Sequence, residues 1–147
     1  MPLYAPTYFS LPFMAGAAVG LSPADSTAYV FGNQSAFNPG VSSLLSQQFH
    51  NFVDRPCVLR GMDLRFEIFG TLGSTENVSV DLIVSSNTVV PIVSTAQFNS
   101  SYVNIRNYAL NTRMSSGDTL LCRFTTPAWA TNPTAVYMHG TAHLEVG

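Results

Sequence analysis

The chain has 147 residues and a formal net charge of −2, and only 10% of its residues are charged, where about 25% is usual. All six basic residues are arginines and they form no cluster, which argues against the basic patch that a nucleic-acid-binding protein needs for phosphates. We therefore predict no nucleic-acid partner. We also predict no membrane partner, because no apolar run reaches the ~18 residues of a membrane span.

The first 23 residues contain prolines at positions 2, 6, 12 and 23, which disfavours a helix and predicts an extended arm. The apolar stretch Leu11–Leu21 is not expected to be a signal peptide, because no positive charge precedes it and Pro12 interrupts it. The arm must bury its large apolar side chains along its own domain or against a neighbouring subunit, and we favour the neighbour. These predicted interaction residues are Leu3, Tyr4, Tyr8, Phe9, Leu11 and Phe13.

Strand patterns begin after the arm. Thr27–Phe31 is rich in β-forming residues, and a loop over 32–40 follows it with the turn sequence Asn-Pro-Gly. Leu44–Val53 is ambiguous between a helical turn and a strand. The clearest strand is Cys57–Phe69, because apolar and charged residues alternate without exception over Met62–Ile68. We predict that it is a central strand of an antiparallel sheet, packed on one side.

The middle of the chain predicts further strands separated by turns. A polar loop over 70–77 precedes Val78–Val84, in which apolar and polar residues alternate. A strand near Val89–Val93 contains Pro91, which predicts a sheet edge or a bulge because proline cannot donate to the ladder. Tyr102–Thr112 predicts one or two strands.

The last third continues the alternation. A turn at 115–118 precedes the strand Thr119–Thr125, and a loop over 126–133 holds the single tryptophan. The final strand is predicted over Thr134–Val146, with one apolar face: Val136, Met138, Gly140, Ala142, Leu144 and Val146. Its other, outward face would present Tyr137, His139, Thr141, His143 and Glu145.

About eight short strands with no convincing helix predict an all-β fold class. We expect a two-sheet antiparallel β-sandwich of the jelly-roll type, with an extended N-terminal arm. No repeat or linker divides the sandwich, so the predicted parts are the Pro-rich arm, 1–23, and the jelly-roll domain, 24–147.

The histidines and cysteines are candidate site residues. His139 and His143 would lie about 13 Å apart along a strand, too far to share one metal ion, so no metal site is predicted. We predict instead that they and Tyr137 form an outward interaction face, exposed to solvent or lying at an interface. Cys57 and Cys122 allow one disulfide, but we favour two buried thiols.

Nothing in the chain predicts an enzyme or a cofactor. Asp63 and Glu67 would share the outward face with Arg65, which indicates ion pairs rather than acid–base catalysis. Gly-x-Ser-x-Gly elbows, phosphate loops and Cys-x-x-Cys pairs are absent. Trp129 could stack on a sugar, although a lone tryptophan in a sandwich loop more often caps the core.

Four segments carry a family resemblance: Asp25–Gly32, Gly70–Asn77, the pair Gly117–Asp118, and Pro127–Pro133, which is the most specific. Together they resemble small jelly-roll proteins and domains of tailed phages, related in shape to the TNF/C1q-like sandwich, over roughly 24–146. The resemblance implies a virion component, either a capsid-surface protein or the head of a fibre or spike, commonly a homotrimer. It implies no catalytic residue.

Our leading hypothesis is therefore a phage virion structural protein at the capsid surface. It would be a cement or decoration protein that binds the major capsid protein and stabilises the head as a homotrimer. The low charge and many uncharged polar residues fit a surface covered by copies or by a partner, or a hydroxyl-rich exported protein. The alternative is a receptor-binding, glycan-binding head of a tail fibre or spike, although such heads usually follow a shaft in the same chain. A secreted TNF-like ligand is disfavoured because no signal peptide is predicted.

Overall fold

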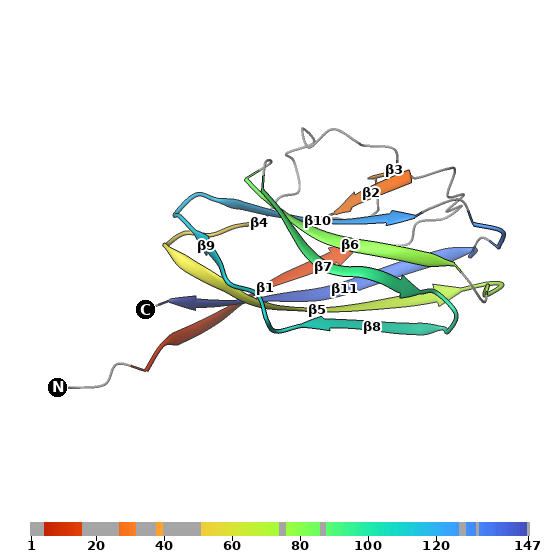
Figure 1. Cartoon of the computed structure of the whole chain (residues 1–147), viewed down its shortest axis with the longest axis horizontal. Helices are drawn as coiled ribbons and strands as arrows, with labels where there is room; N and C mark the ends of the chain where they lie inside the picture. Colours follow the sequence, from red (N-terminus) through yellow and green to blue (C-terminus); the bar gives the residue numbers. More distant parts are fainter. Residues whose placement is uncertain are drawn as a thin grey trace.

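The computed structural model describes residues 5–15, 27–31, 38–39, 51–73, 76–85, 88–126, 129–131 and 133–146. These ranges contain strands and no helix, so no helix there is long and apolar enough to cross a membrane (Figure 1). The strands are β1 (Thr7–Ala15), β2 (Thr27–Phe31), β3 (Asn38–Pro39), β4 (Asn51–Phe52), β5 (Cys57–Phe69), β6 (Asn77–Val84), β7 (Thr88–Gln97), β8 (Tyr102–Asn107), β9 (Thr112–Met114), β10 (Thr119–Thr126) and β11 (Ala135–Val146).

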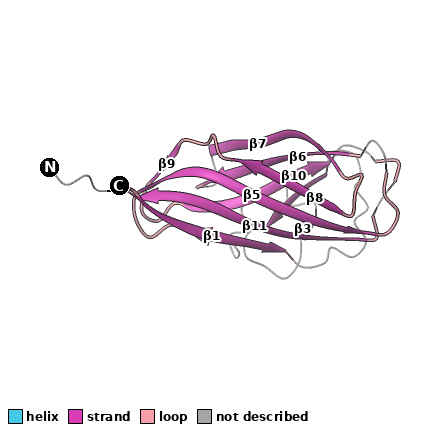
Figure 2. Ribbon diagram, turned by 90° about the horizontal axis from the view of Figure 1, so that it is seen from below, coloured by secondary structure: helices cyan, strands magenta, loops and turns pink. Residues whose placement is uncertain are grey.

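The strands form two antiparallel sheets that lie one over the other, as Figures 1 and 2 show. The first sheet has the order β1-β11-β5-β8, and β9 pairs with the start of β5. The second sheet has the order β3-β2-β10-β6-β7, and β4 pairs with β10. The predicted all-β sandwich is therefore confirmed.

The pairing of the longer strands gives the sandwich its jelly-roll topology. The first of them pairs with the last (β1 with β11), the second with the next to last (β2 with β10), and the pattern continues inward through β5–β8 and β6–β7. Successive pairs alternate between the two sheets, as in a long hairpin wound across both layers. This nesting confirms the predicted jelly roll.

The core follows the alternation predicted for the central strand. On β5, Met62, Leu64, Phe66 and Ile68 are buried between the sheets, while Asp63, Arg65 and Glu67 face outward. A β-bulge interrupts β5, because His143 pairs with Gly61 whereas Leu144 pairs with Leu59, so Arg60 has no opposite residue. The extra residue reverses the alternation of side chains before it. Odd-numbered residues, Cys57 and Leu59, therefore face the core before the bulge, whereas even-numbered residues face it afterwards.

Several expected features agree with the structure at their predicted positions. β7 is the edge of the second sheet, and its pairing with β6 is irregular beside Pro91, as the proline predicted. The segment 102–112 gives two strands, β8 and the start of β9. At the predicted turn, the Asp118 N–H donates to the Ser115 carbonyl over 3.0 Å, and Gly117 has a φ of +89°.

The prediction for the N-terminal arm needs the largest correction. Residues 7–15 form β1, which pairs with β11 of the same chain, and Phe9 and Leu11 pack against their own core. This corrects our preference for a neighbouring subunit at these two positions. Asn38–Pro39 also forms a short strand rather than a loop, and of 44–53 only the β4 pair and the buried Val53 are described. Pro12 is tolerated because β1 is an edge strand, where one side of the ladder needs no donor.

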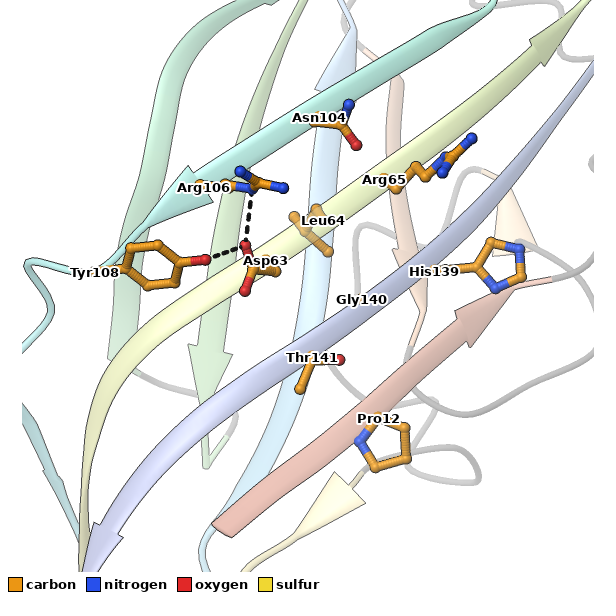
Figure 3. Close-up of a pocket in the computed structure, with 10 residues that line it drawn as sticks. All are labelled: Pro12, Asp63, Leu64, Arg65, Asn104, Arg106, Tyr108, His139, Gly140 and Thr141. Carbon is orange, nitrogen blue, oxygen red and sulfur yellow. Dashed lines mark hydrogen bonds and ion pairs between the residues drawn. The ribbon is translucent and has the colours of Figure 1, made fainter. Parts of the chain in front are cut away.

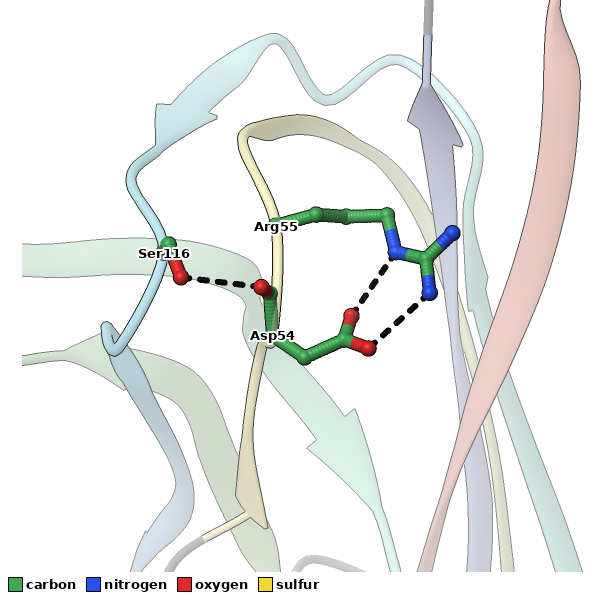
Figure 4. Close-up of polar contacts among 3 residues, drawn as sticks. All are labelled: Asp54, Arg55 and Ser116. Carbon is green, nitrogen blue, oxygen red and sulfur yellow. Dashed lines mark hydrogen bonds and ion pairs between the residues drawn. The ribbon is translucent and has the colours of Figure 1, made fainter.

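A polar turn joins the ends of the two sheets near β4 and β9. Figure 4 shows the Asp54 carboxylate accepting two hydrogen bonds from Arg55, over 2.8 and 2.9 Å, while its carbonyl accepts one from the Ser116 hydroxyl over 2.9 Å. Because the Arg55 side chain hydrogen-bonds to it, the pKa of Asp54 lies below its usual value. The pair is exposed and adds little stability; the backbone bonds between Val53 and the 117–118 turn hold the segment.

The two cysteines lie on facing sheets. Cys57 is on β5 and Cys122 on β10, and both are buried free thiols, which confirms the favoured prediction. Burial raises the pKa of both thiols, and that of Cys122 lies well above its usual value. Neither thiol has the lowered pKa of a reactive cysteine.

Candidate functional site

The outer face of the first sheet carries an unusual set of side chains for a protein with so little charge. Of the large apolar side chains that are exposed in the described part of the chain, five are aromatic residues of this face: Tyr8, Phe69, Tyr102, Tyr108 and Tyr137. Charged side chains lie between them: Arg60, Asp63, Arg65, Glu67, Arg106 and Glu145. This face is the candidate functional surface.

Asp63 is the centre of a polar network on this face. Its Oδ1 accepts a hydrogen bond from the Tyr108 hydroxyl over 2.5 Å, and the Arg106 Nε lies 3.3 Å from the same oxygen (Figure 3). The other oxygen, Oδ2, lies 2.8 Å from the His143 Nε2. The network joins β5, β11, β8 and the segment after β8.

Gly61, beside the bulge on β5, leaves room for the Tyr108 ring close to Asp63. Gly61 is the residue that faces outward next to the bulge, and the Tyr108 ring lies over it. A Cβ on Gly61 would be 2.7 Å from the ring carbon Cδ1 of Tyr108, so only glycine leaves room for the ring. Asn107, the last residue of β8, holds the chain on both sides of Tyr108 in place. Its Nδ2 donates to the Ile92 carbonyl, and its Oδ1 accepts from the Ala109 N–H.

The network lowers the pKa of the Asp63 carboxyl. Burial alone would raise this pKa, but hydrogen bonds from Tyr108 and His143, with the charges of His143 and Arg106, bring it below the usual value. The hydrogen bond to Asp63 also raises the pKa of the Tyr108 hydroxyl. Asp63 is therefore an ionised anchor for three neighbours, and its carboxylate is not free to act as a general base.

The lowered pKa predicts how stability depends on pH. Ionised Asp63 stabilises the fold fully above the usual aspartate pKa, and this contribution is lost as pH falls through the lower pKa of the folded state. We expect Asp63→Asn to lower the free energy of unfolding by about 1 kcal/mol at pH 5 and above, a modest effect because solvent screens the site. In urea titrations the difference from wild type should shrink at pH 3. An equal difference at pH 3 and pH 5 would contradict the network.

An apolar group lies at the end of the same face, where β5 ends and β11 begins. The rings of Phe69 and Tyr137 contact edge to face, with centroids 5.5 Å apart. The Arg65 guanidinium lies 4.4 Å above the Tyr102 ring, and Glu67 stands between Tyr102 and Tyr137 in the strand register. We call Phe69, Tyr102 and Tyr137 the aromatic corner; they are 50%, 54% and 36% exposed.

Between the corner and the Asp63 network lies an open depression of about 520 Å³, which we call the central hollow. Figure 3 shows its residues, which come from four strands and the segment after β8. Its lining residues are Pro12, Asp63, Leu64, Arg65, Asn104, Arg106, Tyr108, His139, Gly140 and Thr141.

The predicted outward residues of the last strand all lie on this face, with different surroundings. Tyr137 belongs to the aromatic corner, His143 contacts Asp63, and His139 lines the central hollow. Among the described residues, no three His, Cys, Asp or Glu side chains are grouped so that they could hold a metal ion. The interaction role of these three residues stays a prediction.

The other predicted residues lie elsewhere. Trp129 is half-buried, donates its indole N–H to the Asn77 carbonyl over 3.0 Å and packs on Phe98, so its role as a glycan contact stays a prediction. In the arm, Tyr8 is exposed on the outer face. Leu3, Tyr4 and the Phe13 side chain lie outside the described residues.

Sequence reasoning missed Tyr108, Arg106, Asn104 and the central hollow. Asp63 and His143 were placed on the outward face, but alternation says nothing about which strands are neighbours. One local signal was present at Asn107. Asparagine often forms a turn by accepting a hydrogen bond from the backbone two residues later, so it could have predicted that β8 ends before Tyr108.

No family model matches the chain, and no curated protein matches it. Among solved structures, it is similar to a chain of Desmodium yellow mottle tymovirus, with a TM-score of 0.37 and 16% sequence identity. That match covers 99% of this chain and 90% of the other. A similarity of this size assigns neither family nor function.

Proposed function

We propose that this protein is a structural component of a virion and works by association rather than by catalysis. The observation that carries the proposal is the aromatic corner on a lysine-free surface. Interface cores are enriched in Tyr, Phe and Arg and depleted in Lys, Glu and Asp, and the corner has this composition. Phe69 and Tyr137 already contact each other, so little side-chain freedom would be lost when a partner covers them.

The finer form of the proposal is a cement or decoration protein on a phage capsid. In this form the chain is a homotrimer that binds the major capsid protein and reinforces the head. Jelly rolls occur in capsid and lectin domains, which makes the fold compatible with such a role without assigning it. The arm, 1–23, and the domain, 24–147, stay the proposed division, although β1 within the arm pairs with β11 of the domain. The residues before β1 are the proposed attachment segment.

Two variants test the proposal. Phe69→Ser with Tyr137→Ser removes the apolar surface of the corner, and Val89→Ser is a matched control, because Val89 is 46% exposed on β7 in the other sheet. In this proposal the corner lies between the subunits of the trimer, so the corner variant becomes a monomer that attaches to a head at one point instead of three. We therefore expect it to bind expanded empty heads of the parent virus at least tenfold more weakly in cosedimentation, with the control unchanged. Failure of the wild-type protein to bind heads would exclude the cement role.

A further inference from the structure

Two arginines, Arg65 and Arg106, line the central hollow. Arg106 contacts Asp63 through its Nε, over 3.3 Å, and Arg65 contacts Glu67 through its Nε, over 3.7 Å. Neither guanidinium donates a hydrogen bond within the described part of the chain, and that of Arg65 also lies over the Tyr102 ring, with its Cζ 4.4 Å from the ring centroid. The terminal nitrogens of a held arginine match the two oxygens of a carboxylate.

The charge at the hollow comes from its two arginines and the carboxylates that pair with them. Its lining includes two arginines and a single carboxylate, that of Asp63. This carboxylate already has three partners, in Tyr108, His143 and Arg106. The Glu67 carboxylate pairs with Arg65 from outside the lining, so two carboxylates balance the two arginines, and an incoming carboxylate would bind the sides of the guanidinium groups that these partners leave open.

The other side chains that line the hollow are better suited to bind a ligand with hydroxyl groups than a simple ion. The side chains of Asn104, His139 and Thr141 line the hollow and make no hydrogen bond with the described part of the chain. The Tyr108 ring, 62% exposed, forms an apolar wall at one end (Figure 3). A few convergent polar groups beside an aromatic ring, around about 520 Å³, have the size and chemistry of a small-molecule site.

We propose that the central hollow binds a carboxylated sugar, such as a sialic or uronic acid unit of a glycan. Arg106 and Arg65 bind the carboxylate, Asn104, His139 and Thr141 bind hydroxyl groups, and Tyr108 packs against the ring. This site differs from the loop around Trp129 that the sequence pointed to. Arg65 also contacts Tyr102 of the aromatic corner, whereas Arg106 contacts Asp63, so Arg106→Gln is the variant that separates this site from the proposed virion role.

The experiment is an NMR titration of the full-length protein with methyl glycosides of N-acetylneuraminic acid and glucuronic acid. The comparison ligands are methyl glucoside, acetate and polyglutamate, and the variants are Arg106→Gln and Arg65→Gln. Arg113→Gln is the control, since Arg113 is an exposed arginine on β9 that does not line the hollow. We expect an acidic sugar to bind with a Kd on the order of millimolar, as suits a shallow site. Each hollow variant should weaken binding about tenfold or more.

Three results would overturn the proposal: no binding of either acidic sugar, equal binding of acetate or of the neutral glucoside, and tighter binding of polyglutamate, which would indicate an acidic peptide. Binding that survives both arginine variants would place the sugar elsewhere and also overturn it. Head binding and solution mass should be unaffected by Arg106→Gln, so failure of the sugar site and failure of the virion role are distinguishable.

Discussion

Phe66→Ala is expected to destabilise the protein by about 3–5 kcal/mol, a large share of the roughly 5–15 kcal/mol that holds a domain folded. Phe66 is fully buried at the middle of β5, and its ring lies 5.1 Å from that of Phe98. Phe98 in turn contacts the Trp129 ring, 5.4 Å away, which is tied to Asn77. Removing the Phe66 ring leaves a cavity that these anchored neighbours cannot fill.

Urea unfolding of the purified variant measures this loss. The control is Phe69→Ala on the same strand, because Phe69 faces outward and is half exposed, so its loss should cost less than about 1 kcal/mol. Similar losses in the two variants would contradict the inward and outward faces assigned to β5.

Gly70→Ala is expected to cost about 2–5 kcal/mol, from two separate causes. Gly70 has a φ of +97°, a left-handed conformation that costs an alanine about 1–2 kcal/mol. A Cβ there would also lie 2.7 Å from the backbone nitrogen of Thr134, and the overlap adds about 1–3 kcal/mol. Thr134 cannot move easily, because its N–H donates to the Phe69 carbonyl over 2.7 Å.

Gly117→Ala separates the two causes. Gly117 has a similar φ, +89°, but a Cβ there would meet nothing within 4 Å, so only the conformational cost of about 1 kcal/mol remains. Thermal unfolding of both variants gives the difference, which we expect to be at least about 1 kcal/mol. Equal losses of stability in the two variants would contradict the close contact between Gly70 and Thr134.

Strand alternation predicted much of the sandwich. β5 and β2 have their predicted bounds, and β6, β10 and β11 differ by a residue, because side chains that alternate between core and solvent leave a period of two. β1 was missed as a strand because its apolar residues, interrupted by Pro12, carry no such period. It is an edge strand held by pairing with β11, a contact between opposite ends of the chain.

The candidate site could be predicted only in part, for a related reason. The outward position of Asp63 and His143 follows from alternation, but their contact depends on the register of β5 against β11, which the bulge at Arg60 shifts. The central hollow draws on β1, β5, β8 and β11, so it exists only once the nested pairing is known. Local periodicity carries no information about that pairing.

Association in solution is the central claim, and light scattering during size-exclusion chromatography tests it most directly. The protein should elute at three times its 15.9 kDa chain mass, as should Val89→Ser, whereas the Phe69→Ser/Tyr137→Ser variant should be a monomer. A version lacking residues 1–6 keeps β1 and loses only the proposed attachment segment. We expect this version to remain a trimer. A wild-type protein that is monomeric at about 1 mM, where even weak specific contacts would form, would contradict the account.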